Sequence, residues 1–273
     1  MATDQGQVTG IPEQGPDGHG LKIGRAGSIA TVTIDRPPVN SLTFAAYDAV
    51  REGFDAISAD PSVSVVLLTA TGRRAFCAGH DVHEFVSLTP ESAHAQLPRV
   101  CAAFDAVQEC GVPVIAAVNG PAVGAGLALA SLCDVRLAST TATFALPEID
   151  VGVLGSASHL MRLVPQGTAR LLALTGRRID AGAALRLGLV EEVYGPDELQ
   201  GAAMALAKEI AGKSRTALRL MKQALNRLEG MPVSAGYQLE CEMTARVRQG
   251  DDAAEGARAY VENRAPRYGG TCL

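Results

Sequence analysis

Asn119–Leu127 reads NGPAVGAGL, a glycine-bearing stretch that follows a predicted strand over residues 113–119 and opens a predicted helix over 123–132. A second such stretch, Phe76–Glu84, reads FCAGHDVHE and comes after a predicted strand over 64–70 and a loop. Small residues at these boundaries leave backbone N–H groups open to a ligand, and a helix start adds unpaired donors and a dipole that favours negative charge. Two N–H groups that converge from the two stretches can stabilise an oxyanion.

The glycines also have a plainer interpretation, because they allow tight turns and close helix packing. They do not form a dinucleotide fingerprint: Gly124-Ala125-Gly126 lacks the G-x-G-x-x-G spacing. The acidic residue about 20 positions further on, Glu148, follows a proline instead of ending a matching strand.

Composition and charge exclude several classes of protein. The chain has 273 residues, of which 47% are hydrophobic, so it can bury a sizeable core in one or two domains of roughly 150 residues. A net charge of −5 does not provide the excess of basic residues that nucleic-acid binding needs. Apolar runs such as Val112–Val118 fall short of the ~20 residues that cross a bilayer, and the first twenty residues lack the pattern of a secretory signal. We therefore expect a soluble cytoplasmic protein with no nucleic-acid or membrane partner.

The six cysteines are scattered and form no CxxC pair, which predicts reduced thiols. The one close histidine pair, His80 and His83, lacks a third ligand nearby, so no metal site is predicted. Cys77 has no evident activating base beside it, and we interpret it as a small packing residue.

The chain divides into three parts. Residues 1–20 are polar and rich in Gly, Gln and Pro, which predicts a disordered leader. Residues 21–195 read as an α/β core and residues 196–273 as a helical part. Thr43 is a candidate cap for the first helix. Strands are predicted over 28–34, 64–70, 113–119, 134–138 and 142–146, a loop over 147–158, and helices over 44–58, 90–108, 123–132, 167–175, 181–187, 196–212, 215–228, 233–249 and 252–263.

Five segments, in order, resemble the crotonase superfamily, the enoyl-CoA hydratase/isomerase proteins, over about residues 21–268. They are Ala30–Pro37 with Asn40–Leu42, Ala75–Glu84, Asn119–Asp134, Phe144–Gly152 and Glu255–Arg264. The resemblance implies an α/β fold with a core of repeated ββα units in a spiral and a helical C-terminal part. It also implies assembly as a homotrimer or a dimer of trimers, a coenzyme A thioester as substrate with no further cofactor, and stabilisation of a thioester enolate.

The resemblance assigns roles to several residues. The oxyanion-hole N–H groups would be those of His80 and Ala125. The substrate-binding positions would be Ala78, Asp81, Val82, Gly124, Pro147 and Tyr260, the last of these on a helix that often closes the CoA site of a neighbouring subunit. The family often has lysine where this chain has His83 and Asn263, which weakens any assignment of the groups that hold the CoA phosphates. Arg36, Arg73 or Arg264 could supply that positive charge, and the sequence does not choose among them.

The acid/base residues decide the reaction. Hydratases of the family typically carry two glutamates; here the first position is Ala128, and the second is kept as Glu148. A single carboxylate suits a proton shuttle between C2 and C4 of a 3-enoyl-CoA, although some relatives hydrate with the second glutamate alone. Glu148 could otherwise be a surface or capping residue. Asp150 is a possible second acid/base, because residues two apart in an extended segment share a side, or else a cap for the next turn.

Two other functions stay open. His80 stands where methylmalonyl-CoA decarboxylases have histidine, but those enzymes lack a carboxylate at the position of Glu148 and use a tyrosine in the following loop, and Val151–Leu160 contains none. With Asp150, His80 would allow decarboxylation or thioester hydrolysis. The loss of the first glutamate would also fit an acyl-CoA binder without catalysis.

Overall fold

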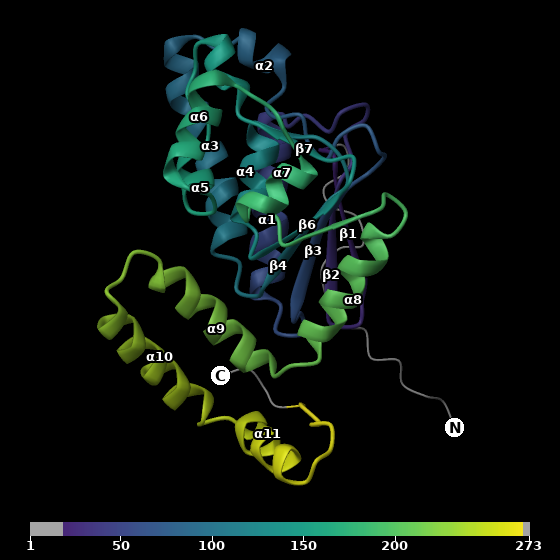
Figure 1. Cartoon of the computed structure of the whole chain (residues 1–273), viewed down its shortest axis with the longest axis vertical. Helices are drawn as coiled ribbons and strands as arrows, with labels where there is room; N and C mark the ends of the chain where they lie inside the picture. Colours follow the sequence, from purple (N-terminus) through teal and green to yellow (C-terminus); the bar gives the residue numbers. More distant parts are fainter. Residues whose placement is uncertain (1–18, 270–273) are drawn as a thin grey trace.

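The structure, a computed structural model, describes residues 19–269 (Figure 1). The leader predicted over residues 1–20 therefore lies outside the described residues except at its last two positions, where the Gly20 carbonyl accepts a hydrogen bond from the Asp35 N–H at 2.7 Å. None of the helices in this part of the chain combines the length and the apolar composition that a bilayer crossing needs.

A six-stranded sheet forms the centre of the molecule, in the order β1-β2-β3-β4-β6-β9. Its strands are β1 Leu21–Ala26, β2 Ile29–Ile34, β3 Val65–Ala70, β4 Val114–Val118, β6 Val135–Ser139 and β9 Glu192–Tyr194. β1 is antiparallel to β2, and all other neighbours are parallel. β3 and β4 are buried along their whole length, which explains why they read as continuous apolar runs rather than as alternating ones.

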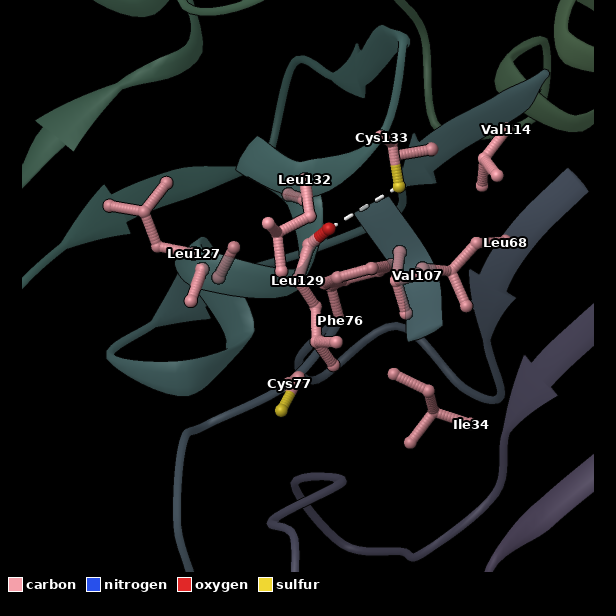
Figure 2. Packing of buried hydrophobic residues seen from close by; sticks show 14 of the residues in the cluster. Ile34, Leu68, Phe76, Cys77, Val107, Val114, Leu127, Leu129, Leu132 and Cys133 are labelled. Carbon is pink, nitrogen blue, oxygen red and sulfur yellow. Dashed lines mark hydrogen bonds between the residues drawn. The ribbon is translucent and has the colours of Figure 1, made fainter. Parts of the chain in front are cut away.

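Helices cover both faces of this sheet. On one face, side chains such as Val66 and Leu68 pack under α1 Phe44–Ala59, α3 Pro90–Gln108 and α4 Ala125–Leu132. Figure 2 shows this side, with Leu68 and Val114 from the sheet near Val107 of α3 and Leu129 of α4. On the other face, the alternate residues of β3 and β4 pack under α8 Leu199–Ala211.

A smaller sheet extends the core beyond the ends of the main strands. It joins β5 Ala122–Val123, β7 Thr143–Ala145 and β8 Ile179–Asp180. The remaining helices of this region are α2 Val82–Val86, the 3-10 helix η1 Pro147–Val151, α5 Ala157–Met161, α6 Gln166–Thr175 and α7 Ala181–Leu187.

The last three helices, α9 Arg215–Leu228, α10 Val233–Val247 and α11 Asp251–Val261, follow one another away from the sheet (Figure 1). An ion pair fastens α9 to the core: Nζ of Lys222 lies 2.8 Å from both carboxylate oxygens of Asp134, which stands just before β6. The division at residue 195 stays a prediction, and α8, which follows it, packs on the central sheet rather than with α9 to α11.

The predicted helices and strands are largely confirmed, and α3, α7 and α9 match to the residue. Thr43 caps α1 as expected, accepting a hydrogen bond from the Ala46 N–H at 3.2 Å. Two expectations were wrong. The predicted loop over 147–158 contains η1 and the start of α5, and the helical region after His159 is interrupted by β8 and β9. Strands of two or three residues are too short to show a period in the sequence.

Candidate active site

The two glycine-bearing stretches meet because they leave the same edge of the sheet. β3 and β4 are parallel neighbours, so the segments that follow them start side by side at their carboxyl ends, where open parallel sheets bind ligands. Two asparagines fasten these segments. Nδ2 of Asn119 donates to the carbonyls of Ala70 and Gly72 at 2.8 and 2.7 Å, and Nδ2 of Asn40 donates to those of Thr71 and Ala75 at 3.0 and 2.9 Å.

His80 forms an isolated parallel bridge with Leu42. Leu42 donates to the Gly79 carbonyl and accepts from the Asp81 N–H, both at 2.8 Å, so the bonds of this bridge go to the two neighbours of His80. The N–H of His80 is therefore turned away from Leu42, and it has no acceptor among the described residues.

Ala125 is the first residue of α4, where a backbone N–H has no partner within the helix. Gly79 lies against it: a Cβ on Gly79 would stand 3.8 Å from the Ala125 nitrogen and 3.1 Å from the Val123 carbonyl oxygen. Gly79 also has a φ of +98°, which side-chain-bearing residues rarely adopt. The close approach that the sequence predicted for the two stretches is thus present.

Glu148 reaches the same place from η1. A Cβ on Gly124 would stand 2.8 Å from Oε1 of Glu148, and one on Gly155 would stand 2.6 Å from its Oε2. Oε2 is buried and accepts no hydrogen bond within residues 19–269. Burial raises the pKa of Glu148 above its ordinary value because the ionised carboxylate loses water, and this effect outweighs a hydrogen bond from its own backbone N–H, which lowers the pKa. A carboxyl group with a raised pKa is suited to both accepting and donating a proton near neutral pH.

These groups line one cavity of about 380 Å³. Gly79, His80, Gly124, Ala125 and Glu148 contribute to one part of its wall, and most of the remainder is apolar. A concave, largely apolar cavity with a few convergent polar groups is the ordinary form of a small-molecule site. The structure thus brings together the predicted acid/base residue and both predicted oxyanion donors.

The His80 imidazole is part of a group of rings in this wall. It stacks on Tyr47 with ring centroids 5.7 Å apart, and it also packs against Phe44 at 4.6 Å and Phe85 at 6.1 Å. Its Nε2 is buried and makes no hydrogen bond in the described part of the chain. Burial lowers the pKa of His80, which favours the neutral form of the ring at physiological pH.

The sequence predicted that Glu148 and Asp150 lie on the same side of their segment, and the reason given for this was wrong. It assumed an extended segment, but Pro147–Val151 forms a 3-10 helix with about three residues per turn, where positions two apart diverge. Asp150 is exposed and still lines the cavity. Its carboxylate lies against Gly176, where a Cβ would stand 2.7 Å from Oδ2.

The predicted substrate-binding positions divide into two groups. Ala78, Val82, Gly124 and Pro147 line the cavity. Asp81 caps α2 instead, accepting from the His83 N–H at 3.0 Å and from the Ser41 hydroxyl at 3.2 Å.

Tyr260 and Ala128 stand apart from the cavity of their own chain. Tyr260 is 87% exposed on α11, at the far end of the molecule from α2 in Figure 1. Ala128, at the position of the family's first glutamate, is buried within α4 with 1% exposure and is not part of the cavity wall. Cys77 is fully buried, and burial raises the pKa of its thiol to about 12, which leaves no thiolate for nucleophilic attack.

Each arginine considered for the CoA phosphates has an acidic partner in the structure. Arg36 lies 3.6 Å from Asp81, Arg73 pairs with Asp197, and Arg264 pairs with Glu255 and Glu262. Within residues 19–269 there is no group of three or more His, Cys, Asp or Glu side chains placed to hold a metal ion.

Comparison with known proteins agrees with this geometry. The family model described as enoyl-CoA hydratase/isomerase matches residues 24–271. The chain belongs to the enoyl-CoA hydratase/isomerase family. It is 41% identical to a (7aS)-7a-methyl-1,5-dioxo-2,3,5,6,7,7a-hexahydro-1H-indene-carboxyl-CoA hydrolase of Mycobacterium tuberculosis over 86% of this chain and 95% of that one. It is 34% identical to a probable enoyl-CoA hydratase of Mycobacterium bovis, over 91% of this chain and 97% of the relative.

A solved structure gives the same result. The enoyl-CoA hydratase from Bacillus anthracis superposes with a TM-score of 0.88 at 31% identity, covering 91% of this chain and 98% of that one. The predicted crotonase-superfamily membership and α/β fold are confirmed, and the protein is an enzyme of the enoyl-CoA hydratase/isomerase family.

The sequence reasoning missed some residues that build the site. Phe44, Tyr47 and Phe104 line the cavity from α1 and α3, but in the sequence they read as ordinary core positions of amphipathic helices. Gly155 touches the Glu148 carboxylate from a segment that was predicted to be a loop. No local signal marks these residues, because their common position arises only when four separate segments pack together.

Proposed function

We propose that the protein hydrates a 2-enoyl-CoA, with Glu148 as the acid/base and the N–H groups of His80 and Ala125 as the oxyanion hole. One observation carries this proposal: a carboxyl group with a raised pKa lies in an apolar cavity beside two backbone N–H groups that have no acceptor among the described residues. Each well-placed oxyanion donor lowers a barrier by about 2.7–4 kcal/mol.

The proposed steps use one carboxylate twice. Glu148 takes a proton from water while the water oxygen bonds to C3, and the electrons of the C2–C3 double bond move onto the thioester oxygen. The N–H groups of His80 and Ala125 stabilise the enolate that forms. Protonated Glu148 then returns the proton to C2, so that the elements of one water molecule have been added. The hydratase named among the relatives supports this direction.

Isomerisation would use the same groups without water. Glu148 would remove a proton from C2 of a 3-enoyl-CoA and return it to C4, through the same enolate. The experiment follows the absorbance of the conjugated enoyl thioester with a short 2-enoyl-CoA and, separately, a 3-enoyl-CoA. Loss of the band with the first substrate supports hydration, whereas its appearance with the second assigns isomerisation.

Two variants make this assay specific. Glu148→Gln removes the proposed base and should lower the rate by about 10²- to 10⁴-fold. Asp150→Asn is the matched control, because Asp150 is a second carboxylate on the same cavity. Comparable losses in both variants would show a two-carboxylate mechanism. Full activity in Glu148→Gln would overturn the proposal.

Hydrolysis is the second candidate function, because the relative at 41% identity is named a hydrolase. Glu148 would then direct water to a carbonyl carbon of the substrate, and the same two N–H groups would stabilise the oxyanion. Release of free CoA, measured with a thiol reagent, distinguishes cleavage of a thioester from hydration.

Decarboxylation predicts turnover of malonyl-type thioesters that survives Glu148→Gln and fails in His80→Ala. Saturable binding with no turnover of any thioester would indicate an acyl-CoA binder.

We also propose that the protein forms homotrimers, or dimers of trimers, in which α11 of one subunit closes the cavity of another. Large apolar side chains of α10 and α11, among them Val233, Tyr237, Tyr260 and Val261, are exposed in the single chain. Tyr260 contributes to substrate binding only in such an assembly, because it is remote from its own cavity. A cytoplasmic location and the absence of a cofactor other than the CoA of the substrate remain part of the proposal.

A further inference from the structure

Aromatic side chains are few in this protein but concentrated at one place. Phe and Tyr together number eleven, Trp is absent, and aromatic residues make up 4% of the chain. Four of them line the cavity, namely Phe44, Tyr47, Phe85 and Phe104. His80 adds a fifth ring. A random distribution of so few rings would not place them around one hollow, so the composition of this wall needs an explanation of its own.

The rings hold one another in place. Tyr47 stacks on His80 with an angle of 17° between ring planes, and Phe104 meets Tyr47 edge-on at 6.0 Å and 73°. Phe85 meets His80 edge-on at 77°. Tyr47 has 1% exposure, and Arg99, which pairs with Asp48, lies over the Phe44 ring at 5.6 Å. These ring contacts restrict the movement of the aromatic side chains against one another.

The rest of the cavity wall is mostly apolar. Aliphatic side chains such as Leu88, Val100 and Val153 also line the cavity. Apolar side chains also stand at its rim, where Leu154 is 94% exposed. At about 380 Å³ the cavity lies within the range of roughly 300–1,000 Å³ that is typical of sites for drug-sized ligands.

A cavity lined by packed aromatic and aliphatic side chains favours a ring over a flexible chain for two reasons. A linear chain leaves unfilled space beside it, and the atoms that line that space lose their dispersion contacts. A ring fills the width, presents a flat face or an edge to the aromatic walls, and has fewer rotatable bonds to immobilise.

We propose that the acyl group this enzyme accepts carries a carbocyclic ring, saturated or aromatic, held against Phe85, Phe104 and the aliphatic side chains that line the same cavity. This inference rests on the proposed function in one respect, namely that the cavity takes an acyl-CoA. It adds the class of acyl group, which the acid/base chemistry does not determine.

The test compares two saturated thioesters, cyclohexanecarbonyl-CoA and heptanoyl-CoA, which have the same number of acyl carbons. Neither can be hydrated or isomerised, so isothermal titration calorimetry reports binding alone, and the thioester is checked for integrity afterwards. We expect the cyclic ligand to bind about fivefold to tenfold more tightly, as one good ring contact provides. Equal affinity, or tighter binding of the linear chain, would overturn the inference.

Variants identify the rings as the cause. Phe104→Leu should reduce the preference for the cyclic ligand to about twofold or less, because it removes one ring face while keeping the site apolar. Phe85→Leu, in the half-buried α2 segment, provides the same test if Phe104→Leu does not fold. The matched control is Phe54→Leu: Phe54 is a buried ring of α1 that does not line the cavity, so the preference should persist. An unchanged preference in both cavity variants would overturn the inference.

The outcomes separate this inference from the proposed function. Equal binding of both ligands, together with turnover of a 2-enoyl-CoA that depends on Glu148, would overturn the ring preference and leave the function standing. A cyclic preference without any turnover would support the ring preference and count against hydration. Failure of both ligands to bind would overturn both.

Discussion

The carboxylate of Glu148 lies against the α-carbon of Gly155, so closely that a Cβ at position 155 would stand 2.6 Å from both Cδ and Oε2. Gly124 limits the carboxylate on its other oxygen, with 2.8 Å between a hypothetical Cβ and Oε1. The backbones of Gly155 and Gly124 therefore restrict the position of this proposed acid/base group. Any side chain at either glycine must displace it.

Gly155→Ala should consequently lower kcat with little change in KM. Displacing a catalytic group by about 1 Å costs on the order of 10²-fold in rate, whereas the apolar wall that binds the acyl group stays in place. Steady-state kinetics on the substrate identified above measure both constants. Gly201→Ala is the control, because a Cβ at Gly201 in α8 meets nothing within 4 Å and should leave kcat unchanged. An equal kcat for Gly155→Ala and the native protein would contradict this account of the site.

The raised pKa of Glu148 predicts the pH dependence of activity. As the proposed base, Glu148 must be ionised, so kcat/KM should fall as the pH decreases through its pKa. Since burial raises that pKa above the ordinary value of 4.5, the acidic limb of the profile should lie at higher pH than an exposed glutamate would give. The measurement is kcat/KM against pH in buffers of constant ionic strength. A limb at or below the ordinary value would contradict the assignment.

The same shift predicts a stability effect of the opposite sign to the activity effect. A carboxyl group whose pKa is higher in the folded than in the unfolded state favours unfolding once it ionises. The penalty is absent below the unfolded value, develops as the pH rises toward the folded value, and is complete above it. Glu148→Gln, which lacks the charge, should therefore be more stable than the native protein at neutral pH and equally stable at pH below 4.5. Thermal unfolding at both pH values measures this, and a variant that is less stable at neutral pH would contradict it.

Much of the fold could be predicted from the sequence because local and tertiary signals agree. α3 begins at Pro90 after Thr89, whose side chain and that of Ser92 form a capping box, and the sequence placed both ends of this helix correctly. The buried strands β3 and β4 likewise appear as continuous apolar runs. Where a segment is as short as β8, packing against a neighbour decides its state, and the sequence carries no periodic signal.

The site shows the same limit. Glu148 and the two glycine-bearing stretches were found because each lies in a segment with its own pattern. The ring wall and the contact of Gly155 with Glu148 were not, since they exist only between segments that are distant in sequence. The reason given for placing Glu148 and Asp150 on a common side was wrong, because it depended on an extended backbone and Pro147 instead starts a 3-10 helix. Both residues nevertheless line the cavity.

The ion pair between Lys222 and Asp134 predicts how firmly α9 is attached to the core. The Lys222 side chain is 3% exposed, and Oδ2 of Asp134 also accepts a hydrogen bond from the Val114 N–H at 2.7 Å. Lys222→Ala should lower the free energy of unfolding by about 3 kcal/mol, because it leaves Asp134 without its counter-ion. Urea unfolding measures the change. Arg51→Ala breaks an exposed pair with Asp55 and should cost no more than about 0.5 kcal/mol. Similar losses for the two variants would contradict the prediction.

The proposed self-association rests on the exposed apolar side chains of α10 and α11. Sedimentation velocity at micromolar concentration should give a species of three or six times the protomer mass of 28.3 kDa. Surfaces that present several large apolar side chains together mark sites of protein association. A strictly monomeric profile would count against the proposed assembly.

Tyr260 gives the sharper test of that assembly, because it can reach a cavity only from a neighbouring subunit. If α11 closes the site of a partner, Tyr260→Ser should raise the KM for the acyl-CoA severalfold and leave kcat nearly unchanged, since the reacting groups are untouched. Tyr237→Ser is the matched control: Tyr237 is 67% exposed on α10 and has no assigned contact with substrate. Sedimentation of both variants separates a lost ligand contact from a lost interface, because a KM effect of the first kind persists in an intact oligomer. An unchanged KM in Tyr260→Ser would place the closing element elsewhere.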